Sequence, residues 1–303
     1  MLSIKIISCA GRGPLGRATL SAVIAAFAAL AAADATSSAP HAYTLSLAGG
    51  SRLMINARIN GVATRALLDS AAEVTILDRE FARRLQLGGG QAVTGQGSGQ
   101  TTFEAALIEG VTLEAVGLSL ANQSVAIADL GDVGRRLLKR RVDVILGREI
   151  FDAARLAIDI DGRRITVVTR ERAPRGVRLE LSAEHGVETV PVSVEKGGPV
   201  RATFDLGNGS HVLISKSFAA RQGLLSDGRA VTTERGGGLG GETARQLITL
   251  RDLELAGRHF SNVMAAIDPQ PSASDVNVGT SVLRHFRITT DYAGRAVWLE
   301  PRD

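Results

Sequence analysis

The chain repeats itself, and this internal duplication limits the fold to two similar units. In the tail of each copy matched residues lie 132 apart, as Gly147 and Gly279 do. Around them, residues 154–160 and 286–292 form alternating apolar segments, each followed by a tight turn and a second apolar segment. This pattern is typical of a β-hairpin. The duplication therefore predicts two homologous lobes that each end in a hairpin.

The head of each copy places an aspartate at the same position. Asp69 and Asp205 lie 136 residues apart, and each follows an apolar segment and precedes small residues. In both copies the pattern then predicts another strand and a short helix, which ends near Leu87 or Leu224. We therefore expect both aspartates at equivalent strand-to-turn junctions.

A glycine-rich stretch lies between head and tail in both copies. It contains Gly95, Gly97 and Gly99 in the first copy and spans residues 236–241 in the second. No Lys-Ser or Lys-Thr pair follows, and the flanking patterns are strands, which argues against a phosphate-binding loop. We expect each stretch to form the tip of a mobile hairpin, or flap.

Composition favours an all-β protein and argues against a nucleic-acid partner. Glycine accounts for 34 of the 303 residues and aromatic residues for only 4%, which indicates many turns around an aliphatic core. The 35 basic and 31 acidic residues give a net charge of +4, too even a balance to hold a polyanion. The basic run at residues 135–141 is interpreted as a solvated face or a helix end.

The N-terminus has the pattern of an export signal. Lys5, Arg12 and Arg17 precede the apolar residues 18–33, and small residues follow that suit cleavage. We expect a signal peptide over residues 1–35 and an exported protein, periplasmic or secreted. The alternative is an uncleaved anchor, which would be the only membrane contact. The single cysteine, Cys9, lies in this segment, so the mature chain lacks cysteine chemistry.

Domain boundaries follow from the duplication and from a polar linker. Residues 170–176 are polar and contain a proline and a glycine. We place the N-terminal lobe at residues 42–170 and the C-terminal lobe at residues 174–303.

Two equivalent aspartates predict a paired acid and base. If the lobes bring Asp69 and Asp205 together, both carboxylates cannot ionise easily, so the pair holds one proton. One member can then take a proton from water while the other donates one to a peptide carbonyl. The five histidines lack metal-ligand spacing, and we expect neither a metal nor a cofactor.

The motifs resemble those of retropepsin-like aspartic peptidases, and in particular the exported bacterial aspartyl protease family proteins with two lobes. The resemblance covers residues 45–299. It rests on the loops at residues 67–72 and 204–208 and on the apolar segments ending in Gly147 and Gly279. It implies two retropepsin- or pepsin-like β-barrel lobes, a protein or peptide substrate, catalytic Asp69 and Asp205, and a flap at Gly95, Gly97 and Gly99.

The catalytic loops depart from the family pattern at two positions. The resemblance implies a hydroxyl after each aspartate for a hydrogen bond across the lobes; Ser70 supplies one and Leu206 cannot. Gly207 keeps the glycine expected next, whereas Ala71 adds a methyl group there. Ser70, Ala71 and Gly207 are thus the supporting turn residues. Two functions follow: an aspartic-type endopeptidase, or a catalytically impaired module that binds peptides in the same groove.

Other polar residues near these motifs have simpler interpretations. A single aspartate at a strand end is most often a turn or cap residue, and only recurrence in both copies favours the catalytic interpretation. Asp159 and Asp291 recur too, but beside hairpin turns, and we interpret them as turn or surface residues. His211 follows Asp205 by six residues and is interpreted as a partly exposed side chain without a catalytic role.

Overall fold

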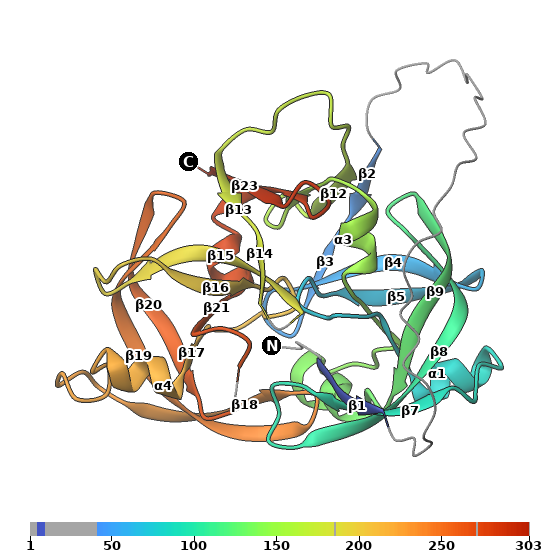
Figure 1. Cartoon of the computed structure of the whole chain (residues 1–303), viewed down its shortest axis with the longest axis horizontal. Coiled ribbons are helices and arrows are strands. Elements are labelled where there is room, and N and C mark those ends of the chain that lie inside the picture. The colour runs from blue at the N-terminus through green and yellow to red at the C-terminus, as the bar shows by residue number, and fades with distance from the viewer. Residues whose placement is uncertain (1–4, 10–40, 185, 271, 303) are drawn as a thin grey trace, which may run out of the picture.

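The computed structural model describes residues 5–9, 41–184, 186–270 and 272–302. The protein is all-β, with two similar lobes side by side and a third sheet joining them (Figure 1). This confirms the fold class expected from the duplication. The apolar segment at residues 18–33 lies outside the described residues. Among the residues that are described, no helix is long and apolar enough to cross a membrane.

The N-terminal lobe is built on a nine-stranded sheet in the order β1-β7-β8-β9-β6-β10-β5-β4-β3. Its strands are β1 (Lys5–Cys9), β3 (Ser46–Ala48), β4 (Arg52–Ile59), β5 (Val62–Leu68), β6 (Ile76–Asp78), β7 (Gln91–Gln96), β8 (Thr102–Ala115), β9 (Leu118–Ala128) and β10 (Val144–Leu146).

The C-terminal lobe repeats this order in the eight-stranded sheet β14-β15-β16-β21-β17-β20-β19-β18. Reversed, this order runs from β18 to β14 and matches the order from β7 to β3 in the first lobe strand by strand. Among the described strands of the first sheet, β1 has no counterpart in the second. Its strands are β14 (Ser182–Glu184), β15 (Val187–Val194), β16 (Val200–Phe204), β17 (Val212–Ser215), β18 (Thr232–Gly238), β19 (Gly241–Leu255), β20 (Arg258–Asp268) and β21 (Val276–Val278).

The two tail hairpins meet edge to edge and form the joining sheet. Strands β11 and β22 pair antiparallel, with Leu156 opposite Thr290, and this sheet lies above both lobes in Figure 1. Its order is β13-β23-β22-β11-β12-β2. Its strands are β2 (Ala42–Thr44), β11 (Leu156–Asp159), β12 (Arg164–Val167), β13 (Val177–Glu180), β22 (Phe286–Asp291) and β23 (Ala296–Pro301).

The helices are short and lie around the sheets. Asp78 and Ser215 cap the two equivalent helices α1 and α4, because their side chains accept hydrogen bonds from the first free backbone N–H groups. These helices end at Arg84 and Arg221, earlier than predicted, and the chain to Leu87 and Leu224 continues as a turn. The helices are α1 (Arg79–Arg84), α2 (Gly131–Val133), η1 (Gly134–Leu138), α3 (Glu149–Ala153), α4 (Lys216–Arg221) and α5 (Thr280–Leu283).

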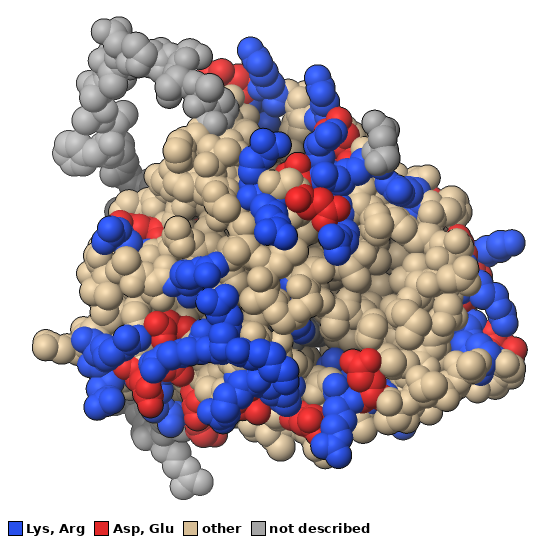
Figure 2. All heavy atoms as spheres, turned by 180° about the vertical axis from the view of Figure 1, so that it is seen from behind, with Lys and Arg blue, Asp and Glu red and all other residues tan. Residues whose placement is uncertain are grey.

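One apolar cluster runs through both lobes and the joining sheet. It includes the fully buried Phe151, Phe204 and Phe286, so the lobes share a continuous core. On the surface, Lys and Arg side chains are interspersed with Asp and Glu over the face shown in Figure 2. The basic run at residues 135–141 covers much of η1 and the turn after it, which agrees with its interpretation as a helix end.

Candidate active site

The two aspartates lie directly after equivalent strands. Asp69 follows β5 and Asp205 follows β16, and both side chains are buried. The backbone N–H of Asp69 donates to the carbonyl of Leu146 over 2.9 Å, and that of Asp205 donates to Val278 over 3.1 Å. Each loop is therefore held by the neighbouring central strand, β10 or β21, in the same way.

Close packing beneath the loops explains the glycines at the ends of β10 and β21. A Cβ at Gly147 would lie 2.6 Å from the carbonyl carbon of Val74, and one at Gly279 would lie 2.3 Å from the carbonyl oxygen of Asn208. Neither position has room for a side chain. The apolar segments ending in glycine thus lie against the aspartate loops in both lobes.

The two loops meet where the lobes face each other. A Cβ at Gly207 would lie 2.3 Å from the carboxyl carbon of Asp69, so the loop of Asp205 touches the Asp69 carboxyl group. Burial, and then repulsion from the Asp205 charge, raises the pKa of Asp69 to about 8. The structure thus brings both aspartates into one buried, electrostatically linked site.

Ser70 ties the two loops together. Its hydroxyl donates to the carbonyl oxygen of Phe204 and accepts from the N–H of Leu206, both over 2.9 Å. Leu206 has no hydroxyl, so it cannot form the equivalent hydrogen bonds to the loop of Asp69. Its side chain is fully buried in the apolar core. Ala71 is buried next to Asp69, and its N–H donates to the Asp69 carboxylate over 2.9 Å.

The carboxylates of the pair have different hydrogen-bond environments. Asp205 accepts from the N–H groups of Gly207 (2.9 Å) and Asn208 (3.0 Å) and from the side-chain amide of Asn277 (2.7 Å). The Asp69 carboxylate accepts from Ala71 alone, and its Oδ2 has no partner among the described residues. The Asp205 carboxylate thus has the fuller set of hydrogen-bond donors, whereas the Asp69 carboxyl group is buried with a raised pKa.

Asn277 was not predicted as a site residue, although the duplication contains a signal for it. It lies in β21 at the position where β10 has Ile145, exactly one repeat spacing earlier. A polar residue replacing a buried isoleucine in a central strand indicates a specific hydrogen bond. Asn208 completes the connection, because its amide donates to the Asn277 oxygen over 2.7 Å.

The glycine-rich hairpin tips of both lobes meet over the site, at the bottom of Figure 1. The N–H of Gly99 donates to Leu239 over 2.8 Å, and that of Thr101 donates to Gly240 over 2.9 Å. Gly97 also packs against Leu239. Gly95 lies within the strand β7 rather than at the tip, and the ring of Phe103 leaves no room for a side chain there. Two of the three predicted flap glycines therefore form the contact between the tips.

Arg136 and Arg245 strengthen the contact between the two hairpins. The Arg136 guanidinium, from η1 of the N-terminal lobe, donates to the carbonyl of Gly238 over 2.9 Å. Arg245, from β19 of the C-terminal lobe, donates to the carbonyl of Ser98 over 3.1 Å. Each flap is thus held by an arginine from the opposite lobe.

Asp291 accepts the N–H of Gly294 over 3.0 Å, as expected for a turn residue, but it is not a surface residue. Its side chain is buried, and Arg155 (2.8 Å) and Arg170 (2.9 Å) form ion pairs with it. These arginines hold the pKa of Asp291 below its usual range against the opposing effect of burial. Asp159 likewise accepts the N–H of Gly162 within its turn, as expected for a turn residue. His211 is partly exposed and lies 3.1 Å from Glu234.

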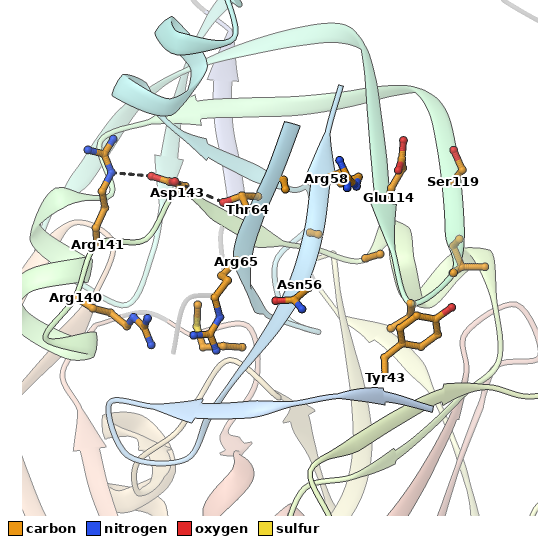
Figure 3. A pocket seen from close by; sticks show the side chains of 17 residues that line it. Tyr43, Asn56, Arg58, Thr64, Arg65, Glu114, Ser119, Arg140, Arg141 and Asp143 are labelled. Carbon is orange, nitrogen blue, oxygen red and sulfur yellow. Dashed lines mark hydrogen bonds and ion pairs between the residues drawn. The ribbon is translucent and has the colours of Figure 1, made fainter. Parts of the chain in front are cut away.

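A hollow of about 970 Å³ lies on the N-terminal lobe away from the aspartate pair (Figure 3). It is lined by side chains of β4 and β5 and by the turn between β8 and β9, and neither Asp69 nor Asp205 reaches it. Arg141 and Asp143 form an ion pair of 2.7 Å at its edge. Among the described residues, no cluster of His, Cys, Asp and Glu could hold a metal ion.

Comparisons with known proteins agree with this geometry. A search of solved structures matches basic 7S globulin from soybean, with a TM-score of 0.53 and 9% identity, over 86% of this chain and 94% of that one. A search of curated protein sequences finds no match. The family model described as aspartyl protease matches residues 55–150 and again residues 190–282, once in each lobe. These matches cover more than half of the sequence, and the chain belongs to the aspartyl protease family.

Proposed function

We propose that the protein is an aspartic-type endopeptidase whose catalytic pair is Asp69 and Asp205. The contact between Gly207 and the Asp69 carboxyl group is the observation that carries this proposal, because it joins equivalent aspartates of both lobes in one site. The intact Ser70 bridge and the family membership support it.

The chemistry follows from one proton shared by two carboxyl groups. Asp205, which accepts three hydrogen bonds, carries the charge and takes a proton from water as the water oxygen attacks the scissile carbonyl carbon. Asp69 gives its proton to the carbonyl oxygen. When the resulting diol collapses, its hydroxyl proton returns to Asp69, the C–N bond breaks, and Asp205 protonates the leaving nitrogen. The pair again holds one proton.

The flaps define how a substrate enters. Because both hairpin tips are hydrogen-bonded together over a buried pair, they have to separate before a peptide reaches the carboxylates. An extended peptide suits this site, because its backbone can pair with the strands of the separated hairpins. We therefore propose unstructured protein segments or peptides as substrates.

Substitution of each aspartate tests the catalytic role. Asp69→Asn and Asp205→Asn should each abolish nearly all cleavage of an unstructured protein, and the double variant should lose little more, because the two residues act as one unit. Wild-type cleavage should be sensitive to pepstatin and bell-shaped in pH. If the wild type binds extended peptides and cleaves none at any pH, the protein is a binding module and the proposal is wrong.

We also propose that the protein is exported, with residues 1–35 as its signal peptide. Cleavage would remove β1, the edge strand beside β7, and leave an eight-stranded sheet like that of the C-terminal lobe. The basic residues before an apolar stretch support this proposal. Intact-mass measurement of protein from the cell envelope should give a chain that begins near residues 32–40. Recovery of the full-length chain from the cytoplasm would contradict it.

A further inference from the structure

Arg52 is a buried arginine close to the candidate catalytic pair. It is the first residue of β4, and only 5% of its surface is exposed. One of its terminal nitrogens donates to the carbonyl of Gly49, while its Nε has no partner among the described residues. Burying a guanidinium is costly unless a negative charge compensates it. Arg52 therefore requires a counter-charge.

The loop of Asp205 packs directly against Arg52. The N–H of Ser51 donates to the carbonyl of Gly209 over 3.2 Å, and a Cβ at Gly209 would lie 2.5 Å from Cγ of Arg52. Gly209 follows Asp205 by four residues. The turn between β3 and β4 thus fixes the arginine of the N-terminal lobe against the catalytic loop of the C-terminal lobe.

The charges around Arg52 identify its counter-charge. Burial and repulsion from Arg136 and Arg245 lower the pKa of Arg52, while attraction first by Asp205 and then by Asp69 opposes this decrease. In the described part of the chain, no carboxylate forms an ion pair with Arg52 within 4.0 Å. The other nearby cations have carboxylates of their own: Arg136 has Asp132 (2.8 Å), Arg245 has Asp268 (2.7 Å) and Arg284, which contacts Ser51, has Asp161 (2.6 Å).

The fold itself does not require an arginine at this position. The strand pairing identifies the residue of the C-terminal lobe that is equivalent to Arg52. Two residues before Asp69, Leu67 pairs with Met54. Two residues before Asp205, Thr203 pairs with Thr189. Counting back two residues along each strand, Arg52 of β4 corresponds to Val187 of β15. Valine fills the equivalent place in the other lobe and is buried there. The shared fold of the two lobes therefore does not explain the charge at residue 52.

We infer that Arg52 is a positioning residue that supplies the counter-charge for the singly ionised Asp69–Asp205 pair. This inference rests on the proposed peptidase function, and it adds a residue outside the two aspartate loops. A positive charge stabilises the ionised pair relative to the fully protonated one. Without Arg52, the pair should keep both protons up to a higher pH, so the singly ionised, active form should appear at a higher pH than in the wild type.

The pH profile of peptide cleavage tests the inference directly. Arg52→Met should move the acidic limb of kcat/KM upward by roughly one pH unit, because a nearby opposite charge shifts a carboxyl group by about that much or more. Arg52→Lys keeps the charge and should leave the limb close to that of the wild type. The control is Arg58→Met on the same strand, whose exposed guanidinium donates to Gly61. An unmoved limb in Arg52→Met would overturn the inference.

A second measurement does not depend on activity. The stability difference between wild type and Arg52→Met, from urea unfolding, should increase with pH as the pair ionises, and the dependence should disappear in the Asp69→Asn/Asp205→Asn background. A difference that is constant with pH overturns the inference even if the protein cleaves peptides. The expected dependence without any cleavage supports the charge pairing and contradicts the peptidase proposal. If Arg52→Met does not fold, Arg52→Gln replaces it in both measurements.

Discussion

The hydroxyl of Ser70 accepts a hydrogen bond from the backbone N–H of Leu206 in the other lobe and donates one to Phe204, each over 2.9 Å. One hydroxyl can do both, because it has one donor and two acceptor positions. Leu206 occupies the place equivalent to Ser70 but has no hydroxyl with which to bond the backbone of the Asp69 loop. The link between the loops is therefore made by one side chain rather than two.

Ser70→Ala should weaken both the fold and the site. It leaves the buried N–H of Leu206 without a partner, which costs about 1–3 kcal/mol. Urea unfolding should show this loss, and kcat should fall because the loops lose their link. Ser70→Thr keeps the hydroxyl and should retain more of both properties. Equal stability of the alanine variant and the wild type would argue against the bridge.

Leu206→Thr restores the missing hydroxyl and should still destabilise the protein. By the symmetry of the lobes, the new hydroxyl would face the carbonyl of Leu68 and the N–H of Ser70. Each hydrogen bond would add about 1 kcal/mol, whereas removing a fully buried leucine side chain from the core costs about 2–4 kcal/mol. The melting temperature should therefore fall, while the control Leu206→Met changes it little. An increase would show that the packing argument is wrong.

Sequence repetition alone was sufficient to predict much of the fold. Equivalent spacing in the heads and tails identified two lobes and the strand before each aspartate, whereas the apolar segments ending in Gly147 and Gly279 were recognised through the family resemblance. These features are local or repeated, and a pattern of apolar and small residues records them. The roles of Asp69 and Asp205 in catalysis remain predictions, although the structure places both in one buried site.

Features that depend on how the lobes meet could not be read from such patterns. The tail hairpins were predicted, but their edge-to-edge pairing was not, and this pairing is what buries Asp291 beneath Arg155 and Arg170. Arg52 gives no signal beyond being a charged residue at the start of a strand. Its proximity to the Asp205 loop arises from tertiary packing across the whole chain.

Gly207→Ala should remove activity without straining the backbone. The added Cβ would lie 2.3 Å from the Asp69 carboxyl carbon, so the carboxyl group has to move. Displacement by about 1 Å in a catalytic group costs roughly 100-fold in rate. Gly198→Ala is the matched control, because a Cβ there meets no atom within 4 Å. The two variants should differ sharply in kcat, and similar values would contradict the proposed position of Asp69.

Arg136→Gln should loosen the hairpin tip of the C-terminal lobe. It removes the guanidinium that binds the carbonyl of Gly238 from across the lobes. Hydrogen exchange at the amides of residues 237–241 should become faster, because the flap opens more often. Arg135→Gln, which changes an exposed neighbour, should leave this exchange unchanged. Equal exchange in both variants would show that Arg136 does not hold the flap.

Asp69→Asn should make the protein more stable than the wild type at high pH. Burial and the Asp205 charge raise the pKa of Asp69 from 3.8 to about 8, so the folded protein binds this proton more tightly than the unfolded chain does. The stability that the protonated Asp69 contributes to the wild type is fully present below about pH 4 and is lost as pH rises towards about pH 8. Asparagine resembles the protonated carboxyl group at every pH and should remove this decrease.

Urea unfolding between pH 4 and pH 8 measures the effect, with Asp227→Asn as a control of opposite sign. Arg229 holds the pKa of the exposed Asp227 below its ordinary value, so the stability that Asp227 contributes is lost only when pH falls below the ordinary range of a carboxyl group. The free energy of unfolding of Asp227→Asn should therefore differ from that of the wild type by a constant amount from pH 4 to pH 8. That of Asp69→Asn should exceed the wild-type value by an amount that grows as pH rises. If the difference for Asp69→Asn is also constant, the buried carboxyl group does not hold the proton on which the proposed chemistry depends.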